Sequence, residues 1–274
     1  MTDALHVPRV LGHRGSSETA AEHTLAAYRA ALDSGADGLE CDVRLTRDAV
    51  PVCIHDRRVD RTSDGVGRVS ALELADLAAL DFAVDAGVAT DADLDTGEEP
   101  DRDGSGVLTL ERLLDVVLDH GAPVELAIET KHPNRYGGSL EQRVVALLRE
   151  RGLDRAVAGG PNVRLMSFSA LALARVKRLA PALPTVFLVT RATAPLAAGH
   201  LPLGADDVGP SIAVLRHDPG YVRRMQRRGR QVLVWTVNSA ADVDLCCRAG
   251  VDAVITDRPR AVRQLLQARR DQAG

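Results

Sequence analysis

Apolar and polar residues recur along this chain as short apolar runs that alternate with amphipathic stretches. The apolar runs have the length of buried strands, and the stretches between them repeat their apolar residues every three or four positions, as helices do. We predict strands over residues 7–12, 124–129, 163–166, 185–189, 206–208, 231–236 and 253–256. We predict helices over residues 24–32, 110–119, 140–151, 170–179, 221–228, 240–249 and 260–269.

A predicted hairpin over residues 38–56 carries polar residues that are unusual in a strand. In its first arm apolar residues alternate with Glu40 and Asp42, so the strand buries one side and aligns two carboxylates on the other. The second arm, residues 50–54, ends just before His55. Two buried carboxylates one strand pitch apart repel each other unless a cation lies between them.

About eight strands, most of them followed by a helix, predict an α/β fold, the (β/α)8 TIM barrel. A doubly wound open sheet is the alternative, but no Gly-x-Gly-x-x-Gly follows the first strand. The rhythm breaks after residue 57, where one predicted helix at 71–80 precedes a tract rich in glycine and aspartate. We therefore expect a single domain over residues 1–274, with a small inserted subdomain at about 57–106, after the second strand, that lies over the site.

Composition narrows the class of protein. The net charge is −4, with 34 basic and 38 acidic residues, which favours neither a nucleic-acid groove nor an anionic membrane surface. No signal-peptide core follows the first methionine, and no apolar run approaches the roughly 20 residues of a membrane helix. The four cysteines have the spacing of neither a disulfide framework nor a metal site. We expect a soluble, cytoplasmic protein and leave the oligomeric state open, a homodimer included.

Polar residues cluster where a TIM barrel places its chemistry, at the carboxyl ends of its strands. Three carboxylates gathered there need a cation, and hard oxygen ligands favour Mg²⁺ or Ca²⁺. We expect Glu40, Asp42 and Glu129 to bind one such metal. The full set of candidate site residues is His13, Arg14, Glu40, Asp42, His55, Glu129, Lys131 and Trp235.

Each of these residues also has a plain structural interpretation. A carboxylate at a strand end is often a helix N-cap or an ion-pair partner, and Arg14 and Lys131 would then only neutralise charge. A single histidine can be a hydrogen-bonded structural residue, and the one tryptophan can belong to the core. Three carboxylates together with His13 and His55 at neighbouring strand ends favour catalysis.

Phosphodiester cleavage is the reaction that fits this set. A metal with Arg14 and Lys131 would bind the non-bridging oxygens and stabilise the charge that builds on phosphorus. One of His13 and His55 would deprotonate the attacking hydroxyl and the other would protonate the leaving alkoxide, an assignment that the pattern leaves open. The chain has no His-Glu-x-x-His motif of a metalloprotease and no P-loop or kinase signature.

A series of short motifs runs in order along nearly the whole chain. They are His13-Arg14-Gly15, Glu22-His23-Thr24, Gly35-Ala36-Asp37, Glu40-Cys41-Asp42-Val43, Thr46-Arg47-Asp48, His55-Asp56, Arg61-Thr62, Leu108-Thr109-Leu110-Glu111, Glu129-Thr130-Lys131, Ser167-Phe168, Trp235-Thr236-Val237-Asn238, Gly250-Val251-Asp252 and Thr256-Asp257-Arg258-Pro259. With these motifs the chain resembles the glycerophosphodiester phosphodiesterases, a family of PLC-like phosphodiesterase TIM barrels. Ala21 departs from the family's usual proline, at the start of the first helix rather than among the catalytic residues.

The resemblance implies a reaction that releases sn-glycerol 3-phosphate and an alcohol from a deacylated phospholipid. It implies the metal, acid–base and phosphate-binding roles given above, and it leaves open whether a cyclic phosphate forms. We expect Trp235 to contact the substrate and residues 132–136 to read the alcohol group. Two alternatives remain, a lysophospholipase D that acts on substrates with one acyl chain and a catalytically silent binding barrel. A silent barrel should lack a metal ligand or a histidine, and this chain lacks none.

Overall fold

Eight parallel strands close into the barrel that the sequence predicts. The computed structural model describes residues 6–83, 106–156 and 158–273. The strands run in the order β7-β6-β5-β4-β2-β1-β9-β8, and β3 pairs antiparallel with β2 outside this series. β7 and β8 close the ring through single bridges, Val208 with Val232 and Ser211 with Trp235. The strands are β1 Arg9–His13, β2 Gly38–Leu45, β3 Pro51–Cys53, β4 Glu125–Thr130, β5 Asn162–Ser167, β6 Thr185–Val189, β7 Asp207–Pro210, β8 Leu233–Val234 and β9 Ala253–Thr256.

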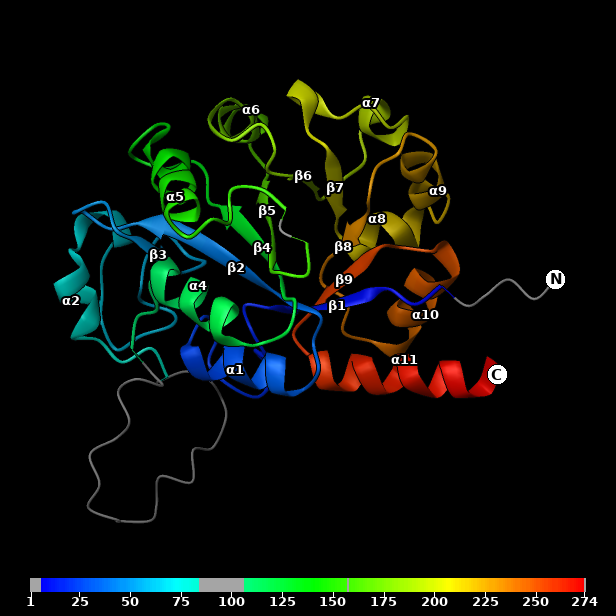
Figure 1. The fold of residues 1–274 in the computed structure, drawn as a ribbon, viewed down its shortest axis with the longest axis horizontal. Helices are drawn as coiled ribbons and strands as arrows, with labels where there is room; N and C mark the ends of the chain where they lie inside the picture. Colours follow the sequence, from blue (N-terminus) through cyan, green and yellow to red (C-terminus); the bar gives the residue numbers. More distant parts are fainter. Residues whose placement is uncertain (1–5, 84–105, 157, 274) are drawn as a thin grey trace, which may run out of the picture.

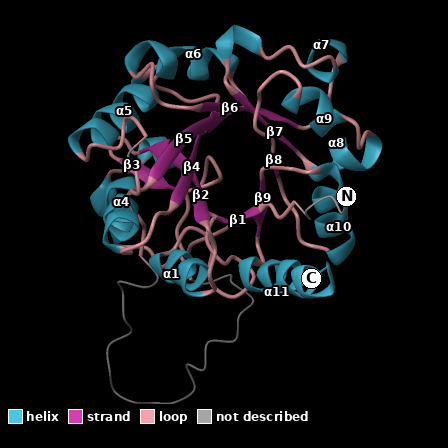
Figure 2. Cartoon of the chain, turned by 45° about the vertical axis from the view of Figure 1, so that its right-hand side comes forward, coloured by secondary structure: helices cyan, strands magenta, loops and turns pink. Residues whose placement is uncertain are grey.

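Helices surround the ring of strands (Figures 1 and 2). Several begin at a threonine or serine whose side chain accepts a hydrogen bond from a backbone N–H of the first turn, as Thr24, Thr109, Ser169 and Ser239 do. The helices are α1 Leu25–Asp33, α2 Leu74–Ala78, α4 Leu110–Asp119, α5 Ser139–Glu150, α6 Ala170–Leu179, α7 Ala194–Ala197, α8 Ile212–His217, α9 Tyr221–Gln226, α10 Ala240–Ala249 and α11 Pro259–Ala273, with 3-10 turns η1 Val69–Ala71 and η2 Pro202–Gly204.

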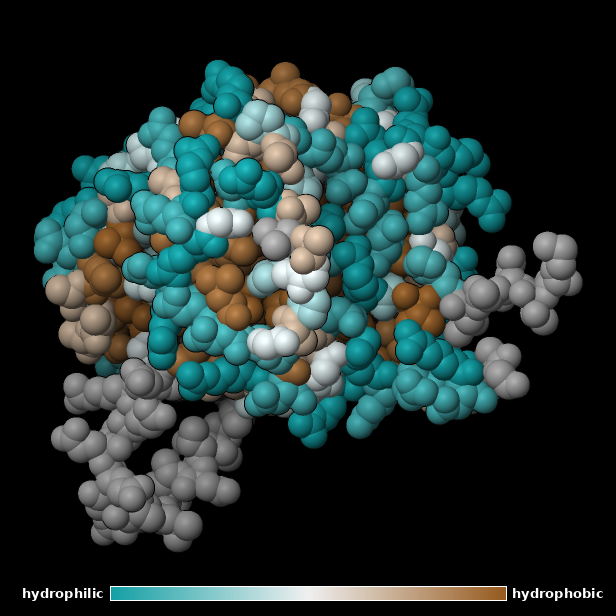
Figure 3. All heavy atoms as spheres, in the orientation of Figure 1, coloured by the Kyte–Doolittle hydropathy of each residue, from teal (hydrophilic) through white to brown (hydrophobic). Residues whose placement is uncertain are grey.

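The strands bury apolar side chains on both faces, as a parallel sheet under helices requires. Leu11, Met166, Leu233 and Ile255 belong to a cluster that fills the barrel, and two larger clusters lie between strands and helices. On the face drawn in Figure 3, hydrophilic residues cover most of the surface and hydrophobic residues show in smaller patches. Within the described residues, no helix combines the length and the apolar character needed to cross a membrane.

Most predicted elements are confirmed, and α4, α6, β6, α10 and β9 begin and end where the sequence indicates. The helix predicted at 71–80 is shorter, because a 3-10 turn and the five-residue α2 occupy that stretch. The strand predicted at 231–236 has only two residues, and α7 and α8 were not predicted. Helices of four to six residues are too short to display a full amphipathic repeat.

The predicted inserted subdomain falls only partly within the described residues. Its first part, up to residue 83, forms a small hydrophobic cluster with Val59, Leu77 and Phe82 beneath the β3 segment. The glycine- and aspartate-rich part, residues 84–105, lies outside the described residues.

A buried arginine joins several strands at the end of the barrel opposite their carboxyl termini. The Arg164 guanidinium lies 2.7 Å from Glu125, 3.1 Å from Asp207 and 3.1 Å from the Gln231 side chain, and Arg9 also pairs with Glu125. Arg164 is 7% exposed, and Glu125 is 6% exposed. Removing the guanidinium would leave two carboxylates with an uncompensated part of their charge in a poorly solvated place.

We therefore expect Arg164→Ala to lower the free energy of unfolding by about 3–5 kcal/mol. Urea unfolding at neutral pH measures this. Arg155→Ala, at an exposed arginine, is the control and should change stability by less than about 0.5 kcal/mol. Equal stability of the two variants would contradict the inferred importance of this network.

Candidate active site

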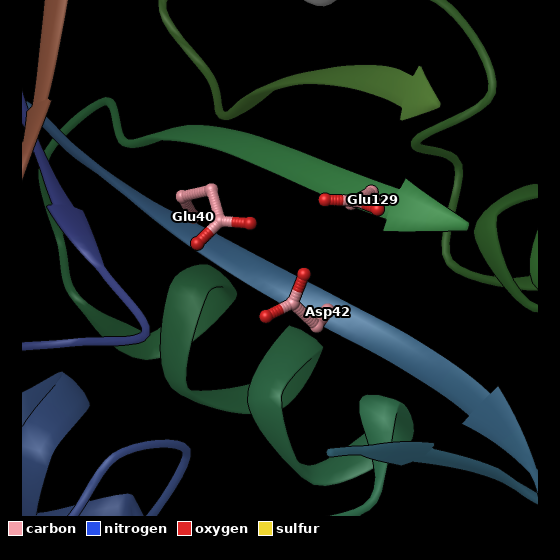
Figure 4. A group of neighbouring side chains, drawn as sticks. All are labelled: Glu40, Asp42 and Glu129. Carbon is pink, nitrogen blue, oxygen red and sulfur yellow. The ribbon is translucent and has the colours of Figure 1, made fainter. Parts of the chain in front are cut away.

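Three buried carboxylates converge from the middle of β2 and the carboxyl end of β4, level with the carboxyl end of β1. These strands pair in parallel with Asp42 opposite Glu129, and the pairing of β1 with β2 places His13 opposite Glu40. Each of the three carboxylates offers an oxygen within 4.8 Å of the other two. Figure 4 shows their side chains leaving two neighbouring strands on the same side. The alternation along β2 and the strand register thus bring together the three residues that the sequence singles out.

Two cations lie against these carboxylates. The Lys131 ammonium is 2.7 Å from Asp42 Oδ1 and 2.9 Å from Glu129 Oε2. Arg14 Nε is 3.1 Å from Asp42 Oδ2, and the Arg14 backbone N–H donates to both the backbone carbonyl and the side chain of Glu40. Arg14 Nη1 also lies 3.1 Å from Glu22, so the two cations do not fully balance the three carboxylates.

Burial and mutual repulsion shift the pKa values of the carboxyls in different directions. Burial and the nearby Asp42 charge raise the pKa of Glu129 to about 7, and the same two causes raise the pKa of Glu40 well above its usual value. Burial would also raise the pKa of Asp42, but the hydrogen bond from His23 and the charge of Lys131 hold it well below its usual value. Asp42 is therefore the anionic centre of the group, and its two neighbours lack a full counter-charge.

The donor set suits a divalent cation. Oxygen ligands from Glu40, Asp42 and Glu129 are the type that Mg²⁺ and Ca²⁺ prefer. A divalent ion would supply positive charge beside carboxylates that Lys131 and Arg14 balance only in part, because Arg14 also pairs with Glu22.

Each of the two predicted histidines has a carboxylate behind it. His13 Nδ1 lies 2.6 Å from Asp257 Oδ1, and His55 Nδ1 lies 2.7 Å from Asp56 Oδ1. His13 Nε2 faces the acidic group, 4.0 Å from Glu40 Oε2. A neutral imidazole that donates its Nδ1–H to a carboxylate has its lone pair on Nε2. A proton exchanged by either imidazole would therefore pass through Nε2.

The carboxylates behind the two histidines are candidate functional residues that the sequence pattern alone does not single out. Asp56 and Asp257 occur in the quoted motifs, and each follows a strand end, but neither received a role. A third histidine, His23, is buried and bonds Asp42 Oδ2 at 3.0 Å and the Tyr28 hydroxyl at 2.8 Å. The adjacency of His55 and Asp56 was a usable signal. His23 stands in the matching motif Glu22-His23-Thr24, but nothing in that motif indicates its contact with Asp42.

The carboxylate behind His13 should make stability depend on pH. Burial would raise the pKa of Asp257, but its hydrogen bond with His13 lowers this pKa to about 2, below the ordinary value of 3.8. A depressed pKa means that the ionised group stabilises the fold above pH 4 and that this stabilisation is lost as the pH falls towards 2. Because the side chain is 32% exposed, the effect should be on the order of 1–2 kcal/mol.

We expect Asp257→Asn to lose less stability than the wild type when the pH falls from 6 to 2.5. Urea unfolding midpoints at the two pH values give the loss of stability between pH 6 and 2.5 for the wild type and for the variant. A variant that loses as much stability as the wild type would show that this carboxylate is not held ionised by its partners.

All eight candidate residues line one cavity of about 160 Å³. One side of the cavity is charged and the other is apolar. On the apolar side the Trp235 ring meets Phe168 edge-on, with ring centroids 5.6 Å apart, and Trp235 Nε1 donates to the Gly209 carbonyl. The tryptophan thus lies at the cavity wall. The lining residues are His13, Arg14, Glu40, Asp42, His55, Glu129, Lys131, Met166, Phe168, Leu188, Trp235 and Ile255.

Known proteins resemble the chain over nearly its whole length. A model of the glycerophosphoryl diester phosphodiesterase family matches residues 13–261. The "Probable glycerophosphodiester phosphodiesterase 1" of Mycobacterium tuberculosis (strain H37Rv) is 43% identical over 261 residues, which are 95% of this chain and 93% of the relative. The glycerophosphodiester phosphodiesterase of Bacillus subtilis is 32% identical over 91% of this chain and 83% of its own length.

A solved structure shares the fold. It is an Oleispira antarctica phosphodiesterase in complex with the product sn-glycerol-3-phosphate, and it superposes with a TM-score of 0.79 at 25% identity. The match covers 95% of this chain and 97% of the solved one.

Proposed function

The chain belongs to the glycerophosphoryl diester phosphodiesterase family, and we propose that it hydrolyses glycerophosphodiesters to sn-glycerol 3-phosphate and an alcohol with two histidines and one divalent cation. It is a phosphodiesterase and therefore a hydrolase. The observation that carries the proposed mechanism is the shared cavity, in which His13 and His55 line the same space as three carboxylates and two cations.

The cation would be held by Glu40, Asp42 and Glu129, as Ca²⁺ or Mg²⁺. When bound, it would supply a positive charge that polarises the phosphoryl oxygens. Arg14 and Lys131 bind the non-bridging oxygens of the phosphodiester and orient it. Lys131 is buried and Arg14 is partly buried beside the carboxylates, and charged hydrogen bonds are stronger in such a place than in water.

The two histidines move the protons of the reaction. One imidazole accepts a proton at Nε2 from the attacking hydroxyl, and the other donates a proton to the leaving alkoxide. Asp257 behind His13 and Asp56 behind His55 hold the tautomers and stabilise the protonated forms. The proton removed by one histidine and the proton supplied by the other balance over the cycle.

Trp235 and Phe168 form the wall against which the carbons of the glycerol pack. An apolar wall could also contact an acyl chain, so lysophospholipase D activity is the second candidate function. Phe168 is 44% exposed and nearby Leu171 is 62% exposed, so apolar surface extends outwards from the β5 side. Comparing turnover of a lysophospholipid with turnover of its deacylated headgroup diester distinguishes the two activities, and we expect the diester to be preferred.

The domain plan that we propose is a single barrel over residues 1–274, with a small insertion at about 57–106 after the second strand. We further propose a cytoplasmic location, which the four buried free cysteines support because none is paired in a disulfide.

Release of sn-glycerol 3-phosphate tests the proposed function. A panel of glycerophosphodiesters that differ in their alcohol is incubated with the protein, with and without a chelator, and the product is measured by a coupled dehydrogenase assay. The proposal predicts release from at least one diester and its loss with chelator. If none of the diesters releases product in the presence of Mg²⁺ or Ca²⁺, the proposal is refuted.

A further inference from the structure

A second cavity of about 340 Å³ lies beside the first and is lined by arginines. Its walls come from β2, from the segment that follows His55, and from the loop after β4. The side chains that matter here are Arg44, Arg57, Arg68, Asn134, Arg135 and Tyr136. No acidic residue lines this cavity among the described residues.

Among the described residues, these four arginines differ from their neighbours in having no acidic partner. In the part of the chain that the structure describes, no carboxylate lies within ion-pair distance of Arg44, Arg57, Arg68 or Arg135. By contrast Arg58, on the same segment, pairs with Asp60 at 2.7 Å. Four like charges around one space repel one another, and an anion within it would relieve that repulsion.

Hydrogen bonds hold several of the side chains that line this cavity in place. Arg44 is half-buried, and two of its N–H groups donate to the His55 carbonyl at 3.0 and 2.6 Å, which leaves its other N–H groups for a ligand. The Tyr136 hydroxyl donates to the Ser70 carbonyl at 2.9 Å, and the Arg135 guanidinium lies over the Tyr136 ring at 5.8 Å. These contacts join the loop after β4 to the segment that carries Arg68.

Three chain segments line both cavities. In each segment, a residue that lines the first cavity is followed two positions later by a residue that lines the second. Asp42 lines the first and Arg44 the second, and the same step separates His55 from Arg57 and Lys131 from Pro133. Two residues of extended chain span about 7 Å. That length matches the separation between a phosphodiester phosphorus and an anionic group on the far side of a small alcohol.

We propose that this arginine-lined cavity binds an anionic group, a phosphate or a carboxylate, on the alcohol part of the glycerophosphodiester. The inference rests on the proposed function and names the class of substrate that the site prefers. Guanidinium groups bind phosphate and carboxylate oxygens in pairs of parallel hydrogen bonds, so the recognition is geometric as well as electrostatic. It also gives the loop after Lys131 the alcohol-reading role that the sequence suggests.

The test compares two substrates that differ by one charged group, glycerophosphoglycerol and the same diester with a phosphate on its terminal hydroxyl. The variant is the double substitution Arg68→Gln and Arg135→Gln, at two exposed positions outside the catalytic cavity. Arg58→Gln is the matched control, since this exposed arginine has its own acidic partner. The measurement is kcat/KM from the disappearance of each diester, because cleavage of the phosphorylated one releases a glycerol phosphate from both halves.

We expect the double variant to lose roughly 10- to 100-fold in kcat/KM for the phosphorylated diester and to stay within about 2-fold of wild type for the other one. Arg58→Gln should act like wild type on both. Equal changes for the two substrates, or no change, would overturn the proposal.

Two further arms separate related outcomes. If inorganic phosphate inhibits the wild type and the double variant loses only this inhibition, the cavity binds a free anion and the proposal is wrong. If wild type turns over neither substrate, the proposed function fails. The proposal about the arginine-lined cavity can then still be tested by measuring ligand binding. Calorimetry with the phosphorylated diester should then show an affinity that the double substitution weakens, and equal binding to both proteins would overturn the inference.

Discussion

Replacing His13 or His55 by alanine is expected to lower kcat for glycerophosphodiester hydrolysis by about 10²- to 10⁴-fold. Each imidazole is held by a carboxylate at Nδ1 and lines the cavity with the carboxylates and cations, so each is positioned to transfer a proton. Both side chains are partly exposed, and the core does not depend on them. The measurement is kcat for release of glycerol 3-phosphate, together with the circular dichroism spectrum and the urea midpoint.

His200→Ala is a suitable control, because this histidine is exposed and lines neither cavity. It should keep wild-type turnover. Retained activity in both His13→Ala and His55→Ala would refute acid–base catalysis by this pair, and loss of the native spectrum would be read as a folding defect.

Glu129→Gln is expected to weaken binding of the divalent cation without lowering the stability of the cation-free protein. The substitution removes one of three carboxylate ligands, so affinity for Ca²⁺ or Mg²⁺ should fall by more than the ~10- to 100-fold typical of residues that only support a ligand, and turnover should fall with it. In the absence of cation the variant should be as stable as wild type or more so. The reason is that burial and repulsion from Asp42 already raise the pKa of Glu129 to about 7, which makes its ionised form costly.

Isothermal titration calorimetry measures the affinity, and urea unfolding with a chelator measures the stability. Glu111→Gln, at an exposed glutamate on α4, should change neither quantity appreciably. A Glu129→Gln protein that binds the cation as tightly as wild type would remove this residue from the proposed ligands.

The barrel could be predicted from the sequence because its strands and helices have different hydrophobic periods. Helices such as α4, α6 and α10 show a clear apolar stripe, and their starts coincide with a threonine or serine cap. The eight candidate residues, which line one cavity, could be singled out for a related reason. Charged residues are rare in buried strands, and the carboxyl ends of barrel strands all lie at one end of the molecule.

Contacts between distant segments could not be predicted in the same way. Asp257 meets His13 across 244 positions, and the hydrogen bond between His23 and Asp42 depends on the path of the loop before α1. The arginine-lined cavity combines three segments whose arginines look like ordinary surface charges in the sequence. Only the strand register and the folded loops show that these groups lie beside the catalytic cavity.

The proposed mechanism needs Glu40, Asp42 and Glu129 to bind one divalent cation, with His13 and His55 on either side of the bound phosphorus. Diffraction from crystals grown with Mn²⁺ and sn-glycerol 3-phosphate, measured at an energy where manganese scatters anomalously, can show this. We expect one anomalous peak within bonding distance of all three carboxylates, and both imidazole Nε2 atoms within hydrogen-bond reach of the phosphate. A peak elsewhere, or an imidazole turned away from the phosphate, would contradict it.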